Sequence, residues 1–189
     1  DELAHAAGAD PVAFRLALAT DERLEALIRL AAEKAGWGEK LPDGHFRGIA
    51  AHKSFNTYVA EVAEISLAGD SFKVERVVAA VDCGTVVNPD VVRAQVEGGI
   101  GFGLGHAMGA AITLTKGEVD QANFDTYPTL RIGQMPKVEV HMIASAAAPT
   151  GIGEPGVPPI APAVANALRA ATGRPVHSLP FSQESPKPA

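Results

Sequence analysis

A loop rich in glycine and proline carries a single ionisable side chain. Residues 149–159 contain three glycines and four prolines, and Glu154 is the only charged residue among them. Proline fixes φ and removes a backbone donor, while glycine permits conformations closed to other residues, so this loop should be rigid. A carboxylate held among apolar neighbours is desolvated, and desolvation makes it a stronger base. Glu154 is therefore a candidate general base. The alternative is an exposed loop carboxylate close to the start of a helix.

A second candidate lies on a predicted helix over residues 89–108. Asn88-Pro89 places an N-cap residue before a proline in the first helical position. Gln95 on this helix offers both a donor and an acceptor, which suits a ligand rich in heteroatoms, although a solvated glutamine is the simpler alternative. Each interior glycine costs about 1 kcal/mol relative to alanine, so a glycine stripe indicates close approach by another helix or a bulky ligand. The stripe consists of Gly98, Gly101, Gly105 and Gly109.

Three other chemistries have weaker support in the sequence. His52, Ser54 and Asp82 could form a hydrolase triad, but the Gly-x-Ser-x-Gly turn of a nucleophile is missing. Cys83 could be a nucleophile, although a buried, inert cysteine is the better interpretation. The glycines of residues 99–105 do not have the Gly-x-Gly-x-x-Gly spacing, and no βαβ unit frames them, so a Rossmann site is excluded.

The elements that must position these residues follow from periodicity and turn signals. Residues 1–38 form a helical lead-in, with helices ended by glycines. Alternating patterns over residues 46–83 predict consecutive antiparallel strands, because the linkers are too short for crossover helices. A further strand is predicted over 137–143 and a helix over 161–171. The fold class is therefore α+β, an antiparallel sheet packed with a few helices, within one domain over 1–181. The polar tail 182–189 is predicted to be disordered.

Composition removes several classes of function. The chain has 189 residues and a formal net charge of −6, which argues against nucleic-acid binding because that requires clustered basic residues. No apolar run approaches the length of a membrane span. Cys83 is the only cysteine and the six histidines are scattered, so this chain should not ligate a metal or an iron–sulfur cluster through its own side chains. No export signal is visible, so the sequence does not define a compartment.

Four motifs in order carry a resemblance to a known family. The first motif is Val-Asp-Cys-Gly-Thr-Val-Val-Asn-Pro at 81–89, and the second is Ala-Gln-Val-Glu-Gly-Gly at 94–99. The third is Asn-Phe-Asp-Thr-Tyr-Pro at 123–128, and the fourth is Gly-Ile-Gly-Glu-Pro-Gly-Val-Pro-Pro at 151–159. Together they resemble the C-terminal portion of the molybdopterin-binding large subunit of the xanthine dehydrogenase/aldehyde oxidase family. The isoquinoline 1-oxidoreductase beta-subunit branch is the most similar. The likeness covers about residues 1–181.

The resemblance implies roles for individual residues. Glu154 matches the family's glutamate in Gly-Glu-Pro, which acts as the general base. Gln95 matches the glutamine that contacts the pterin cofactor, and the neighbouring Gly98 and Gly99 would let that cofactor approach the helix. The implied cofactor is molybdenum-molybdopterin, in its cytosine dinucleotide form, with the metal held by the pterin. Iron–sulfur clusters would lie only on a partner subunit.

The implied function is oxidative hydroxylation of an aldehyde or an N-heterocyclic aromatic, with water as the oxygen source. The family's other cofactor segments are not found in this chain. The resemblance therefore implies three partners: the upstream half of the large subunit, a ferredoxin-like iron–sulfur small subunit and a small-molecule substrate. The alternative is a non-catalytic fragment or structural subunit that docks on a partner and completes a cofactor site. A hydrolase using His52 or Cys83 remains a further alternative.

Overall fold

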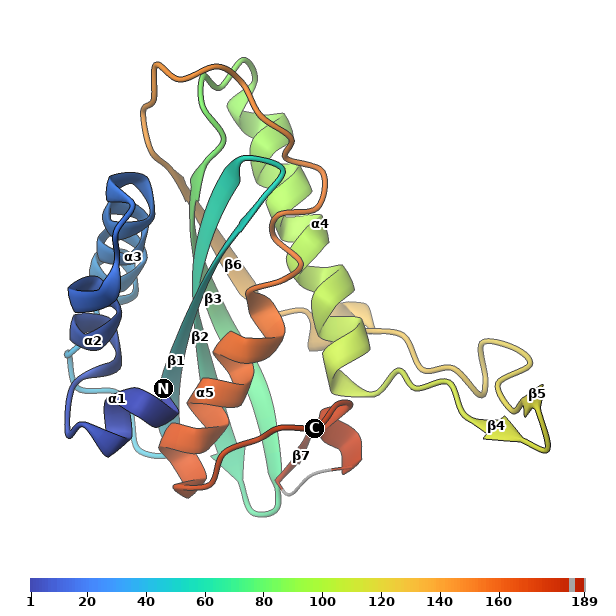
Figure 1. Ribbon diagram of the computed structural model, residues 1–189. Helices are drawn as coiled ribbons and strands as arrows, with labels where there is room; N and C mark the ends of the chain where they lie inside the picture. Colours follow the sequence, from blue (N-terminus) through green and yellow to red (C-terminus); the bar gives the residue numbers. More distant parts are fainter. Residues whose placement is uncertain (184–185, 189) are drawn as a thin grey trace.

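The structure, a computed structural model, describes residues 1–183 and 186–188. The helices and strands occur in a fixed order along the chain (Figure 1). The helices are α1 (Glu2–Ala6), α2 (Pro11–Leu18), α3 (Glu22–Ala35), α4 (Pro89–Met108) and α5 (Ile160–Thr172), with 3-10 turns η1 (Ile132–Gln134) and η2 (Phe181–Gln183). The strands are β1 (His45–Ser54), β2 (Thr57–Ala68), β3 (Ser71–Asp82), β4 (Leu114–Thr115), β5 (Glu118–Val119), β6 (Lys137–Met142) and β7 (Lys187–Pro188).

The main sheet is mixed, which refines the predicted topology. Strands β1, β2 and β3 form the expected antiparallel meander, with Ala50 opposite Glu61 and Glu61 opposite Ala79. Strand β6 pairs with β3 in parallel, and β7 pairs with the other end of β3, also in parallel. The parallel pairing is possible because the connection from β3 to β6 contains α4 and is long enough to carry the chain back to the same end of the sheet. The α+β class is confirmed.

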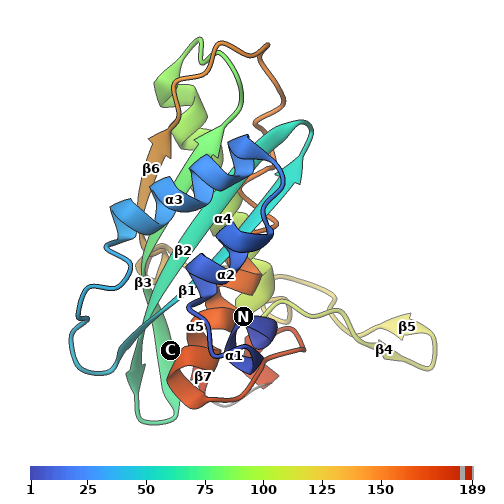
Figure 2. The same ribbon diagram turned by 60° about the vertical axis from the view of Figure 1, so that its left-hand side comes forward.

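Helices cover both faces of the sheet (Figures 1 and 2). On one face, α3 packs Leu27, Ile28 and Ala31 against strand residues such as Val62 and Val78. The other face packs against α4 and α5. There α5 lies directly on β1, because a Cβ at Gly48 would come within 2.2 Å of the Ala167 backbone nitrogen. The two glycine-rich segments of the sequence both belong to this second face.

Part of the C-terminal tail lies among the described residues and follows a buried aromatic side chain. Phe181 is fully buried and its ring lies edge-on to that of Phe72, with centroids 6.0 Å apart. This contact brings the tail to the β2–β3 turn, where the Lys187 N–H donates to the Asp70 carbonyl at 2.8 Å. The described tail residues thus lie close to Phe72 and the β2–β3 turn, and the disorder of residues 182–189 stays a prediction. Residues 184, 185 and 189 lie outside the described residues.

An arm leaves the body between α4 and β6. The small β4–β5 hairpin lies near its tip, and both views show it projecting away from the sheet (Figures 1 and 2). In the described part of the chain, no helix has the length and apolar character needed to cross a lipid bilayer.

Candidate functional site

Helix α4 begins where the sequence predicts and carries Gln95 along its exposed face. The Asn88 side chain accepts hydrogen bonds from the backbone N–H groups of Asp90 and Val91, at 3.0 and 3.2 Å. Pro89 occupies the first helical position. Three and seven residues after Gln95, Gly98 and Phe102 lie on the same face of the helix. No hydrogen-bond partner is found for the Gln95 amide among residues 1–183 and 186–188, so it is free to bind a ligand.

The glycine stripe is covered mainly by the chain itself. A Cβ at Gly101 would lie 3.2 Å from the Met135 sulfur, one at Gly105 would lie 3.5 Å from the Leu130 nitrogen, and one at Gly109 would contact Pro128. The close approach expected from the stripe is therefore made at these three positions by the segment 128–135. Gly98 differs, because a Cβ at this position would have nothing within 4 Å in the described part of the chain. The stripe leaves open space for a ligand at this glycine alone.

A second pair of glycines on α4 fixes the loop that carries Glu154. A Cβ at Gly99 would lie 3.3 Å from the backbone of Gly156, and one at Gly103 would lie 2.6 Å from an Ile160 methyl group and 3.0 Å from the Val157 carbonyl. The loop between β6 and α5 therefore packs directly on the helix backbone, as Figure 1 shows. Since Gly156 follows Glu154 by two residues, this packing determines how far the carboxylate lies from α4.

The helix and the loop border a pocket of about 500 Å³. Two of the predicted site residues, Gln95 and Glu154, line it from opposite elements, together with Gly98 and Gly99. The sequence thus identified residues from two separate motifs that the fold brings to one cavity. The remaining lining residues are Ser54, Phe55, Phe102, Gly153, Val157 and Pro158.

The environment of Glu154 differs from the sequence expectation in one respect. Its side chain is exposed in this chain, whereas the sequence predicted a carboxylate desolvated by apolar neighbours. The neighbour before it, Gly153, has no side chain, and the apolar Val157 and Pro158 lie on the wall of the pocket without covering the carboxylate. The pocket is consequently open to solvent on the side of Glu154.

Two aromatic residues of the pocket were missed by sequence reasoning. Phe102 is 63% exposed and its ring lies against that of His106, with centroids 4.5 Å apart and the ring planes tilted by 54°. Its position seven residues after Gln95 was a usable signal, because that spacing returns to the same helical face. Phe55, also 63% exposed, sits in the β1–β2 turn at φ 51°. A bulky residue at positive φ is uncommon, and the sequence pattern did not predict this conformation of Phe55.

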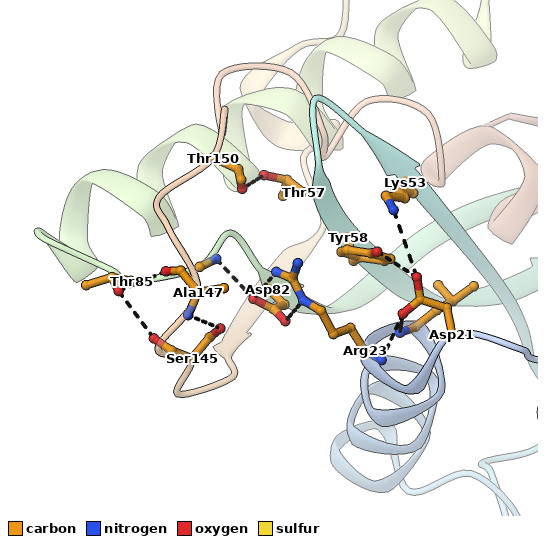
Figure 3. Close-up of polar contacts among 12 residues, drawn as sticks. Asp21, Arg23, Lys53, Thr57, Tyr58, Asp82, Thr85, Ser145, Ala147 and Thr150 are labelled. Carbon is orange, nitrogen blue, oxygen red and sulfur yellow. Dashed lines mark hydrogen bonds and ion pairs between the residues drawn. The ribbon is translucent and has the colours of Figure 1, made fainter.

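The structure gives no support to the hydrolase triad that the sequence left as a weak alternative. Arg23 donates to both Asp82 carboxylate oxygens at 2.7 Å, and the N–H of Gly84 donates to one of them at 3.0 Å (Figure 3). The Arg23 guanidinium holds the pKa of the Asp82 carboxyl below its usual range. Asp82 therefore serves as an anchor for α3, and none of its hydrogen bonds within the described residues reaches His52 or Ser54.

Cys83 does not fit the role of a nucleophile either. Its side chain is buried, and burial raises the pKa of the thiol, which lowers the fraction present as the reactive thiolate. Within the described residues, no group of three or more His, Cys, Asp or Glu side chains is arranged to hold a metal ion. The pocket on α4, lined by Gln95 and Glu154, is therefore a better candidate for a functional site than Cys83 or the residues around Asp82.

The fold is an α+β domain with a pocket between helix α4 and the loop that carries Glu154. Residues 14–136 match the family of molybdopterin cofactor-binding domains, and the chain belongs to this family. It is 39% identical to isoquinoline 1-oxidoreductase subunit beta of Brevundimonas diminuta, over 96% of this chain and 24% of that protein. It is 31% identical to membrane-bound aldehyde dehydrogenase [pyrroloquinoline-quinone] of Gluconacetobacter polyoxogenes, over 95% of this chain and 26% of that protein.

Solved structures agree with this assignment. The Cu,Mo-CO dehydrogenase in its carbon monoxide reduced state superposes with a TM-score of 0.56 and 28% identity. The match covers 62% of this chain and 16% of that chain. The chain therefore spans about a quarter, or less, of the proteins that it resembles.

Proposed function

We propose that this chain forms one wall of the cofactor site of a molybdenum hydroxylase. The family membership supports a molybdopterin ligand, and the pocket offers groups suited to it. The Gln95 amide has unused donors and an unused acceptor, and the space above Gly98 admits a flat, heteroatom-rich ring close to the helix backbone. Gln95, Gly98 and Gly99 would hold the pterin, in its cytosine dinucleotide form. The open helix surface at Gly98, beside Glu154, is the observation that carries the proposal.

The proposed reaction is hydroxylation of an aldehyde or an N-heterocyclic aromatic. A substrate carbon–hydrogen bond is replaced by a carbon–oxygen bond, water supplies the oxygen, and two protons and two electrons are released. When bound, the molybdenum group supplies the two-electron oxidation. Glu154 would accept the proton that the attacking oxygen gives up, a role worth about 10²–10⁴ in rate. The named relatives support the substrate classes, since one is an isoquinoline oxidoreductase and another an aldehyde dehydrogenase.

The exposure of Glu154 fits a site that further protein completes. A general base works best in a site from which water is excluded, and this chain leaves the carboxylate open on one side. The upstream half of the large subunit would cover that side and supply the rest of the cofactor site. The electrons would leave through iron–sulfur clusters on a ferredoxin-like small subunit.

Molybdenum and pterin content tests the proposal. In the complete large subunit, Gln95→Leu should lower the molybdenum and pterin that copurify by about tenfold, because the amide's hydrogen bonds to the pterin are lost. Gln121→Leu, in the arm and away from the pocket, is the matched control and should leave both at the wild-type level. A wild-type subunit that binds neither molybdenum nor pterin would favour the second candidate, a structural subunit without a cofactor of its own.

A further inference from the structure

The loop that carries Glu154 has a second anchor, opposite its contact with α4. This anchor lies at the start of β2, where Thr57 is fully buried although its side chain is polar. The Thr57 hydroxyl oxygen is 2.6 Å from the Thr150 hydroxyl and 2.6 Å from the Gly151 carbonyl oxygen. Figure 3 shows the Thr57 and Thr150 side chains pointing toward one another across the end of the sheet.

The direction of these hydrogen bonds follows from the groups involved. A carbonyl oxygen can only accept, so the single proton of the Thr57 hydroxyl must be donated to Gly151. Thr57 can then serve Thr150 only as an acceptor, and the Thr150 hydroxyl donates to it. The chain of donors therefore runs from Thr150 through Thr57 to the Gly151 backbone, and Thr57 is required for both bonds.

Two further contacts hold the same end of the loop. The Thr150 N–H donates to the Cys83 carbonyl at 2.9 Å. A Cβ at Gly151 would lie 3.1 Å from the Phe55 Cβ, so the β1–β2 turn presses on the loop at this glycine. Glu154 thus lies between two fixed points, three residues after Gly151 and two residues before Gly156, which packs on α4.

We propose that Thr57 is a positioning residue, which fixes the Gly151 backbone and thereby aims the Glu154 carboxylate into the α4 pocket. The role of Glu154 as base rests on the proposed function, whereas the anchoring of the loop does not. Thr57 touches neither substrate nor cofactor in this scheme, and acts through the loop alone.

Hydrogen exchange and kinetics of the complete, cofactor-loaded enzyme test the proposal. In Thr57→Val, amide exchange within 151–156 should be up to about thirtyfold faster than in the wild type, because both hydrogen bonds of the Thr57 hydroxyl are lost. Turnover of isoquinoline, or of acetaldehyde where isoquinoline is not oxidised, should fall in kcat by about tenfold. KM should stay within about twofold, since substrate binding does not depend on the aim of the base. The molybdenum content should not change.

Variants of the same hydroxyl chain separate positioning from simple destabilisation. Thr57→Ser keeps the hydroxyl and should restore both loop exchange and kcat. Thr150→Val should have the smaller effect and should add nothing to Thr57→Val, because the outer bond is already absent there. Thr172→Val removes a hydroxyl that donates to the Leu168 carbonyl on α5, and should leave the loop and kcat unchanged.

Two results would overturn the proposal. One is a Thr57→Val enzyme with wild-type exchange in 151–156. The other is faster exchange throughout β1, β2 and β3, which would indicate general loss of stability. A third result separates the two claims: faster loop exchange in Thr57→Val together with a normal kcat in both Thr57→Val and Glu154→Gln. Thr57 would then still fix the loop, but Glu154 would not be the base.

Discussion

A buried carboxyl on β2 makes stability depend on pH in a defined direction. Glu61 is fully buried between Ala50 and Ala79, its partners on the neighbouring strands, on the face covered by α4 and α5. Neither carboxylate oxygen has a hydrogen-bond partner in the described part of the chain. Burial raises the pKa of Glu61 well above its usual range. The folded protein therefore keeps a proton that the unfolded chain releases above about pH 4.3.

The magnitude follows from proton linkage. The contribution of Glu61 is most favourable below the unfolded pKa and falls by about 1.4 kcal/mol for each pH unit above it, until the pH reaches the folded pKa. Between pH 5 and pH 7 the upper limit of this loss is about 3 kcal/mol, reached when Glu61 stays protonated in the folded protein over the whole range. Glu61→Gln replaces the protonated carboxyl with a neutral group of similar shape and has no proton to release. Its free energy of unfolding relative to the wild type should rise across that range by the same amount.

Urea denaturation followed by circular dichroism at pH 5, 6 and 7 measures this difference. Glu118→Gln, on the exposed strand β5, is the matched control and should track the wild type at every pH. A constant difference between Glu61→Gln and the wild type at the three pH values would refute the reasoning, because Glu61 would then be ionised in the folded protein.

Two glycines of α4 should respond in opposite ways to the same substitution. Gly103→Ala should destabilise the protein by about 1–3 kcal/mol in urea denaturation, since its Cβ would lie 2.6 Å from Ile160. Wild-type stability of this variant would show that the loop can move away. The Cβ of Gly98→Ala meets no neighbour among the described residues, so this variant should stabilise the helix by up to about 1 kcal/mol. Its molybdenum and pterin content should fall, because the Cβ occupies the pocket. Full molybdenum and pterin content would argue against a ligand at this point.

Local signals in the sequence predicted much of the fold. Asn88-Pro89 marks the start of α4 through a side-chain cap and a fixed φ, both of which act within one helical turn. The Gly69-Asp70 turn likewise sets the β2–β3 pairing. Long-range packing escaped the sequence. The parallel pairing of β6 depends on the path of α4, and the contact of Phe181 with Phe72 joins residues far apart in the sequence.

The candidate site divides in the same way. Glu154 and Gln95 could be selected because an isolated carboxylate in a rigid loop and a polar side chain beside glycines are unusual patterns. The exposure of Glu154 could not be predicted, because it depends on which side chains surround it in space. The sequence left the partner of the glycine stripe open between another helix and a bulky ligand, and the segment that covers most of the stripe is not an α-helix. The structure divides the stripe, with Met135, Leu130 and Pro128 covering three positions and the pocket facing Gly98.

The rate of the first turnover in Glu154→Gln tests the central claim most directly. In the complete enzyme, with molybdenum and pterin content equal to the wild type, reduction by substrate should slow by about 10²–10⁴ because the amide cannot accept the proton. Reduction at the wild-type rate with a full complement of cofactor would contradict the assignment of Glu154 as the base.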